Sequence, residues 1–507
     1  MNNKIKTLGE LKASGYISKS IKQEIRDNLI KKIQAKENPF PGILGYEDSV
    51  IPDTERALLS QHNILFLGLR GQAKTRMARQ MTELLDEYIP IVAGSEINDD
   101  PLHPVSRFAI DIIEVKGDAT PIEWLHRSQR YGEKLATPDV SVADLIGDID
   151  PIKAANLKLN FADERVLHYG IIPRSNRCIF VINELPDLQA RIQVSLFNIL
   201  EEGDLQIRGF KLRLPLDVLF VFTANPEDYT NRGSIVTPLK DRIESQILTH
   251  YPKSIETSLE ITAQEADINE AQQQRVKVSD LVKRLIEQVA FEARASELVD
   301  KKSGVSARLT ISAYENAVSA AERRAIINNE KQTQVWLSDL IGIIPSITGK
   351  IELVYEGEQE GPYQVAFNLL EKAIRTQFSA YFPNPDTLKK KRPKESSPAD
   401  NPYKAITRWF DSGNSLNIFF ETKDEDKVQL MYKVDGLNAL VKKYFKAANE
   451  NENALLMEFV LHGLAAYSLI SKKVMEGKIE FKDLMGSMLN IGTQHFSEED
   501  LNEDDFN

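Results

Sequence analysis

The residues best suited to chemistry lie in the stretch NILFLGLRGQAKTRMAR, where an apolar run is followed by a turn and then by Lys74 and Thr75. The stretch follows the phosphate-binding pattern G-x-x-x-x-G-K-[ST], with Ala73 in place of the second glycine. In such a loop, backbone N–H groups converge on phosphate oxygens, the lysine reaches the outer phosphates and the hydroxyl binds magnesium. The sequence therefore predicts a site for ATP and Mg2+. Its predicted residues are Gly68, Arg70, Gly71, Gln72, Ala73, Lys74, Thr75 and Arg76.

A second apolar run, CIFVI, delivers Asn183 and Glu184 to its carboxyl end. Beside a phosphate loop, Glu184 is placed to polarise the attacking water. The position before it usually carries an acid that holds a magnesium-bound water, and Asn183 can offer an amide oxygen there without the charge. A third run, VLFVFTAN, ends at Asn225, which is predicted either to orient water or only to begin a turn before Pro226.

Composition limits the class of protein that can carry these residues. A chain of 507 residues is too long for one core and predicts two to four domains. With 63 Lys and Arg against 75 Asp and Glu, the net charge is -12, which argues against a DNA-binding surface. Cys178 is the one cysteine, and its apolar surroundings predict a buried thiol. With no expected signal peptide or apolar run of about 20 residues, we expect a cytoplasmic protein without membrane insertion.

The elements that must position these residues follow from periodicity. Residues 1–38 predict an amphipathic helical arm. Over 39–254, the apolar runs NILFLGL, RFAIDIIEV, CIFVI and VLFVFTAN alternate with helical patterns, which predicts an α/β fold with a parallel sheet between helices. Residues 255–380 predict a mainly helical lid with a small hairpin at GKIELVYEGEQEGP. A linker over 381–402, a C-terminal helical domain over 403–495 and an acidic, disordered tail over 496–507 complete the expected organisation.

Five segments, GLRGQAKT, NELPDL, TANPED, PLKDR and VSARLT, occur in an order and spacing that resemble the MoxR and magnesium-chelatase branch of the AAA+ ATPases. The resemblance covers roughly residues 37 to 370, and a P-loop with alanine before the lysine is familiar in this branch. It implies an AAA+ core and a homo-oligomeric ring, usually a hexamer, with nucleotide between neighbouring subunits. It also implies a protein client, or a target that receives a metal, and a partner with a von Willebrand A domain.

The resemblance implies further site residues. Arg242 matches the arginine finger that reaches the phosphate of the adjacent subunit, although it could instead be a solvated salt-bridge partner. Arg308 matches the lid arginine that contacts nucleotide. Ile43, Leu44 and Gly45 match the stretch beside the adenine. The segments DLIGDIDPIKAANLKLNFADERVLHYG and LQIRGFKLRL match the hairpin insertions of this branch.

Three functions remain open at this point. The leading hypothesis is a remodelling or chaperone-like ATPase, and within that class a magnesium chelatase subunit is the alternative. A nucleotide-gated scaffold that hardly hydrolyses ATP is a rival from another class, and Asn183 favours it. An ATP-driven transcription activator is not favoured, because no DNA-binding module is recognised and the balance of charge is acidic.

Overall fold

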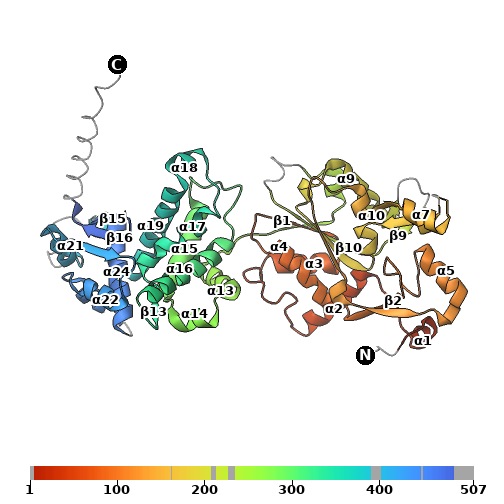
Figure 1. Cartoon of the computed structure of the whole chain (residues 1–507), viewed down its shortest axis with the longest axis horizontal. Helices are drawn as coiled ribbons and strands as arrows, with labels where there is room; N and C mark the ends of the chain where they lie inside the picture. The colour runs from red at the N-terminus through yellow and green to blue at the C-terminus, as the bar shows by residue number, and fades with distance from the viewer. Residues whose placement is uncertain are drawn as a thin grey trace, which may run out of the picture. The chain divides into compact units, whose positions relative to one another are not determined.

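The computed structural model describes residues 5–160, 163–206, 213–226, 234–389, 401–446 and 449–484. It divides into two compact units, Met1–Tyr251 and Pro252–Asn507 (Figure 1). The predicted acidic tail and residues 390–400 of the predicted linker lie outside the described residues.

The first unit is built on a five-stranded sheet in which every neighbouring pair is parallel. In spatial order, the strands are β11 (Ser245–Leu248), β1 (Ile64–Leu67), β10 (Val218–Ala224), β7 (Cys178–Asn183) and β4 (Tyr131–Leu135). Ranked by position in the chain, this is the order 5-1-4-3-2. The phosphate-loop strand β1 is therefore a direct neighbour of the strand that ends before Asn225, and the strand that ends in Asn183 comes next.

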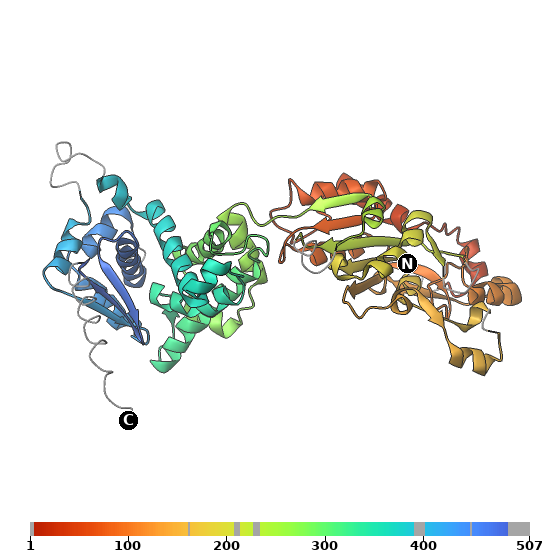
Figure 2. The ribbon, with the colours of Figure 1, turned by 90° about the horizontal axis from the view of Figure 1, so that it is seen from above.

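Alternate residues of each strand face opposite layers, which explains the apolar runs. Ile64 and Phe66 of β1 pack with helices α2 (Ile21–Gln34), α3 (Val50–Leu59) and α4 (Lys74–Gln80) in one core. Leu65 faces a second core that contains helices α9 (Ala190–Ser195) and α10 (Phe197–Glu202). The red N-terminal helices accordingly lie along one face of the sheet in Figure 2. The structure thus confirms the predicted parallel sheet between helices.

The predicted N-terminal helix packs on this sheet and is part of the first unit. Ile21, Ile25 and Leu29 of α2 are buried in its core. Glu24 of the same helix forms a buried bidentate ion pair with Arg130, with N–O distances of 2.6 and 2.8 Å. The residues before the phosphate loop therefore help to hold the sheet.

The run RFAIDIIEV is a helix, α5 (Arg107–Lys116), and its prediction as a strand is wrong. Ser106 caps the helix by accepting a hydrogen bond from the Ala109 N–H, and the Ser106 hydroxyl donates to Asp99 at 2.6 Å. A cap of this kind favours a helix even where β-branched residues are frequent. The cap residues, Ser106 and Asp99, lie outside the run and favour a helix over a strand.

Both expected insertions contain antiparallel strand pairs. Strands β5 (Gly147–Ile149) and β6 (Leu167–Tyr169) flank helix α7 (Pro151–Leu157). Strands β8 (Asp204–Gln206) and β9 (Arg213–Pro215) pair with each other, and residues 207–212 of the predicted insertion lie outside the described residues. Cys178 is buried as predicted, and burial raises the pKa of its thiol to about 12.

The second unit is mainly helical and has one continuous apolar core. Its longer helices are α13 (Ile255–Glu265), α15 (Asp280–Ala295), α16 (Arg308–Ile327), α19 (Pro362–Tyr381) and α24 (Glu450–Ala466). Phe378 of α19 contacts Tyr403 and Phe459 from beyond the predicted linker. The lid and the C-terminal region therefore share a core.

The hairpin predicted in the lid is wrong. Tyr355–Glu360 form helix α18, and Leu353 makes only an isolated bridge to Val299. Gly357 approaches the Leu298 carbonyl so closely that an added Cβ would lie 2.5 Å from that oxygen, so this glycine serves helix packing and not a turn between strands. The C-terminal region is largely helical and adds an unpredicted sheet, formed by β14 (Leu416–Phe419), β16 (Lys478–Lys482) and β15 (Ser471–Met475).

Among the described residues, no helix has the length and apolar character to cross a membrane.

Candidate functional site

The turn between β1 and α4 has the backbone that the sequence predicts for a phosphate loop. Gly71 has φ of 71° and Ala73 has φ of 54°, so both adopt the left-handed conformation. Alanine rarely does so outside constrained sites, where the strain is of order 1 kcal/mol or more. Lys74 and Thr75 then begin α4. The helix amino terminus and its first two side chains therefore lie at the end of β1.

Position 68 has no room for a side chain, because the side chains of Thr249 and Gln72 lie too close. A Cβ added there would lie 2.0 Å from Thr249 Oγ1 and 2.3 Å from Gln72 Oε1, and these two side chains are themselves hydrogen-bonded at 2.6 Å. The substitution Gly68→Ala must break that bond and displace the loop. We expect it to lower the free energy of unfolding by about 1–3 kcal/mol and to weaken nucleotide binding. Thermal unfolding and titration with a fluorescent ATP analogue measure the two effects, and wild-type values in both would contradict the assignment of Gly68 to the loop.

Lys74 connects the loop to the end of β10. Its Nζ donates hydrogen bonds to the carbonyl oxygens of Gly68 and Leu69 and, at 2.7 Å, to Asn225 Oδ1. The register of β1 against β10 pairs Leu67 with Ala224, which brings these two strand ends together. An ammonium and an amide from residues 151 positions apart therefore lie side by side at one edge of the sheet.

The end of β7 is connected to the same edge by Asn183. Its Oδ1 accepts hydrogen bonds from Thr75 Oγ1 at 3.2 Å and from Thr223 Oγ1 at 3.1 Å. Glu184 follows with φ of 57° and ψ of 47°, and its backbone N–H donates to Thr223 Oγ1. The left-handed conformation turns the chain at Glu184, directly after the buried strand.

The predicted adenine-side stretch is anchored to the loop. Ile43 is buried in the core, and Leu44 and Gly45 are partly exposed. The Tyr46 hydroxyl donates to the carbonyl of Gln72 at 2.9 Å, and burial raises the pKa of Tyr46 to about 12. The stretch is thus fixed to the loop through Tyr46, a residue for which no motif predicts a role.

The two arginines implied by the resemblance come from other segments of the chain. Arg242 directly follows α12 (Thr237–Asp241) in the first unit, where it pairs with Glu201 at 2.6 Å and lies over the Phe197 ring. Within one chain, Arg242 therefore forms a salt bridge, which is the alternative role considered for it from the sequence. Arg308 is exposed at the start of α16 in the second unit.

The residues around Thr75 fit a magnesium ion. The Thr75 hydroxyl and Asn183 Oδ1 are neutral oxygen donors of the type that Mg2+ accepts directly or through water. Glu133 of β4 contributes a carboxylate to the same group, because its Oε1 accepts a hydrogen bond from Asn183 Nδ2 at 2.6 Å. Glu133 is not predicted from the sequence, since the segment YGEKL carries no motif. Among the described residues, no group of three or more His, Cys, Asp or Glu could by itself hold a metal.

Comparison with solved structures gives distant likenesses. No family model and no curated protein matches the chain. Among solved structures, an ATPase candidate from Cytophaga hutchinsonii is 18% identical with a TM-score of 0.28, over 72% of this chain and 98% of that one. A model of the BchI and BchD subunits of magnesium chelatase is 18% identical with a TM-score of 0.34, over 63% and 98%. NtrX from Brucella abortus is 13% identical with a TM-score of 0.37, over 72% and 70%. These scores are too low to support a function.

The strand order and the loop describe the fold directly. The chain has an α/β core with a phosphate-loop turn after β1 and the strand order 5-1-4-3-2, and a mainly helical second unit follows it.

Proposed function

We propose that this protein is a magnesium-dependent ATPase that works as a homo-oligomeric ring, with six subunits, on a protein client or a metal-insertion target. A partner with a von Willebrand A domain is part of this proposal, by the resemblance of its motifs to the MoxR and magnesium-chelatase branch. The substrate is ATP, and the products are ADP and phosphate.

One observation carries the proposal. Lys74, Thr75, Asn183 and Asn225 come from three neighbouring strand ends, and the hydrogen bonds Lys74–Asn225 and Thr75–Asn183 join them into one group. A phosphate loop by itself is evidence for nucleotide binding only. Hydrolysis also needs groups that position and activate water. Here these are the Asn225 amide beside Lys74 and Glu184, which directly follows β7.

In this site each side chain has a separate task. The loop amides and Lys74 bind the phosphates, while Asn225 orients water beside the terminal phosphate. Glu184 accepts a proton from that water as it attacks. Thr75 directly and Asn183 through water would hold Mg2+, which would supply positive charge to the phosphate oxygens. Arg242 of a neighbouring subunit stabilises the charge that develops on the transferred group.

A nucleotide-gated scaffold is the second candidate, because Asn183 carries no charge and Mg2+ prefers carboxylate oxygens. The two candidates differ in what Glu184 does. An ATPase needs its carboxylate for turnover, whereas a scaffold needs only the loop.

Glu184→Gln separates these candidates. We expect ATP turnover to fall by at least about 10²-fold, the lower part of the range for a positioned general base, with ATP-analogue affinity retained. Steady-state phosphate release and analogue binding measure the two quantities. Glu83→Gln is the matched control, because Glu83 is a half-exposed partner of Arg127 outside the loop. Equal turnover of Glu184→Gln and the wild type would favour the scaffold. A pull-down with Glu184→Gln and ATP should then retain the client on the assembled ring.

A further inference from the structure

Asn183 has an environment that fixes which way its amide points. A carboxylate only accepts hydrogen bonds, so Glu133 Oε1, at 2.6 Å, must face the Asn183 NH2 group. The amide oxygen is thereby directed to the opposite side, where it accepts from the hydroxyls of Thr75 and Thr223. The oxygen thus faces the predicted magnesium ligand Thr75 because Glu133 occupies the other side.

Glu133 is itself held firmly. Its Oε2 accepts from the Tyr131 hydroxyl at 3.0 Å and from Arg79 at 2.9 Å, which leaves Oε1 for Asn183. Burial and the neighbouring Glu133 charge raise the pKa of Tyr131, so this hydroxyl stays a donor. Arg79 is 66% exposed on its side chain and Glu133 only 28%, so solvent weakens this ion pair.

The strand register places the two residues together. Glu133 is paired with Val181 in the β4–β7 ladder, and Asn183 lies two residues farther along the same face of β7. A charge-assisted hydrogen bond of this length is among the stronger ones, and it polarises the amide so that its oxygen becomes more negative. Together, Glu133 and Asn183 carry one negative charge, as a single aspartate at position 183 would.

We propose that Glu133 is a positioning residue for the magnesium shell: it orients the Asn183 amide oxygen toward Thr75 and supplies the negative charge that Asn183 lacks. In place of the one carboxylate usual at position 183, this site has the Asn183 amide on β7 and the Glu133 carboxylate on β4. This inference rests on the proposed ATPase site and states how that site holds Mg2+ without an aspartate.

Three isosteric variants test the pair, namely Glu133→Gln, Asn183→Asp and the double variant. Glu133→Gln keeps an acceptor for Asn183 but removes the charge, so the Mg2+ concentration for half-maximal binding of a fluorescent ATP analogue should rise about 10-fold or more. Asn183→Asp alone sets two carboxylates within hydrogen-bonding distance, and should lower the melting temperature in EDTA. In the double variant, the introduced glutamine amide donates to the introduced aspartate and one charge remains, so both values should return close to wild type.

The control is Glu83→Gln, which removes the same charge from the same unit. The inference is overturned if Glu133→Gln leaves the half-maximal Mg2+ concentration unchanged, or if the double variant is only the sum of the two single ones. A Glu133 that merely ties β4 to β7 would change the melting temperature without changing the Mg2+ requirement. Analogue binding reports on the pair even if wild-type turnover is absent, so the failure of the ATPase proposal is recognised separately. A wild type with no Mg2+-dependent nucleotide binding would overturn both.

Discussion

Arg242→Ala is expected to lower ATP turnover of the assembled protein by about 10³–10⁵-fold, the contribution of an arginine that one protein supplies to the site of another. In the proposed role, Arg242 would act on charge that appears only as the phosphoryl group is transferred, so analogue binding should change far less than turnover. Turnover and binding are measured on the same samples, over a series of protein concentrations. Wild-type turnover per subunit should rise with concentration as rings form.

The ion pair with Glu201 makes a control necessary for this variant. Removing Arg242 also breaks a pair with an N–O distance of 2.6 Å and a contact with the Phe197 ring. Glu201→Gln breaks the same pair but keeps the cation. Because Glu201 is 58% exposed on its side chain, the pair should contribute at most about 1 kcal/mol to stability. Turnover of Glu201→Gln should therefore remain within a few-fold of wild type.

Mixing two inactive proteins tests the action in trans. Lys74→Ala lacks the loop lysine but keeps Arg242, and Arg242→Ala has the opposite defect. In mixed rings at equal amounts, about one interface in four combines an intact loop with an intact arginine, since such interfaces are head-to-tail. Recovered turnover on mixing is the expected result. No recovery, or a demonstrated monomer with a constant rate per subunit, would contradict the assignment.

The sheet of the first unit could be predicted because each core strand is apolar on both faces. The runs ILFL, CIFVIN and VLFVFTA are buried along nearly their whole length, so their composition alone marks them as central strands. RFAIDIIEV has a similar composition, but its structure depends on a cap held by Asp99, seven residues before the capping Ser106. The prediction of a lid hairpin is wrong for a related reason, since Gly357 packs against a distant carbonyl.

The site shows the same division between local and non-local information. Lys74, Thr75, Asn183, Glu184 and Asn225 are visible because each follows an apolar run. Glu133, Thr223 and Tyr46 act through pairings across 26 to 50 residues, and the sequence predicts no role for any of the three. From the sequence alone, Asn183 predicts weaker Mg2+ binding, because it has no charge where an acid is usual. The register of β4 against β7 sets the Glu133 carboxylate beside it, so Asn183→Asp alone is expected to bring two carboxylates together.

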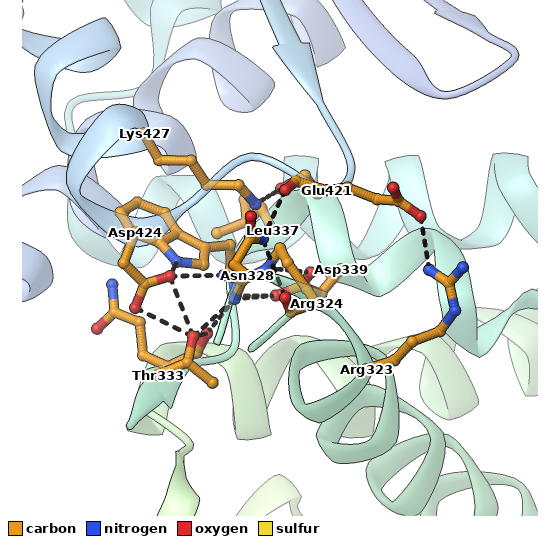
Figure 3. A network of polar contacts seen from close by, with 12 residues as sticks. Arg323, Arg324, Asn328, Thr333, Leu337, Asp339, Glu421, Asp424 and Lys427 are labelled. Carbon is orange, nitrogen blue, oxygen red and sulfur yellow. Dashed lines mark hydrogen bonds and ion pairs between the residues drawn. The ribbon is translucent and has the colours of Figure 1, made fainter. Parts of the chain in front are cut away.

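The second unit is joined internally by a buried ionic group centred on Arg324 of α16 (Figure 3). Arg324 is 2% exposed, and its guanidinium donates to Asp339 at 3.1 Å and to Asp424 at 2.6 Å. Burial lowers the pKa of Arg324, but the two carboxylates outweigh that effect and raise it overall. Asp424 begins α22 (Asp424–Tyr432), beyond the predicted linker. One arginine therefore ties the C-terminal region to the lid.

Arg324→Met should lower the free energy of unfolding of the second unit by about 3–5 kcal/mol, because it leaves Asp339 and Asp424 buried without their counter-charge. For a unit of this size, the melting temperature should fall by roughly 6–20 °C, measured by calorimetry. The adjacent Arg323 is the matched control: it is 69% exposed and pairs with Glu421 at 2.9 Å, so Arg323→Met should cost no more than about 1 kcal/mol. Arg324→Lys keeps the charge but cannot reach both carboxylates as a planar fork does, and should fall between them. Equal melting temperatures for the Arg323 and Arg324 variants would show that the buried group does not hold the C-terminal region in place.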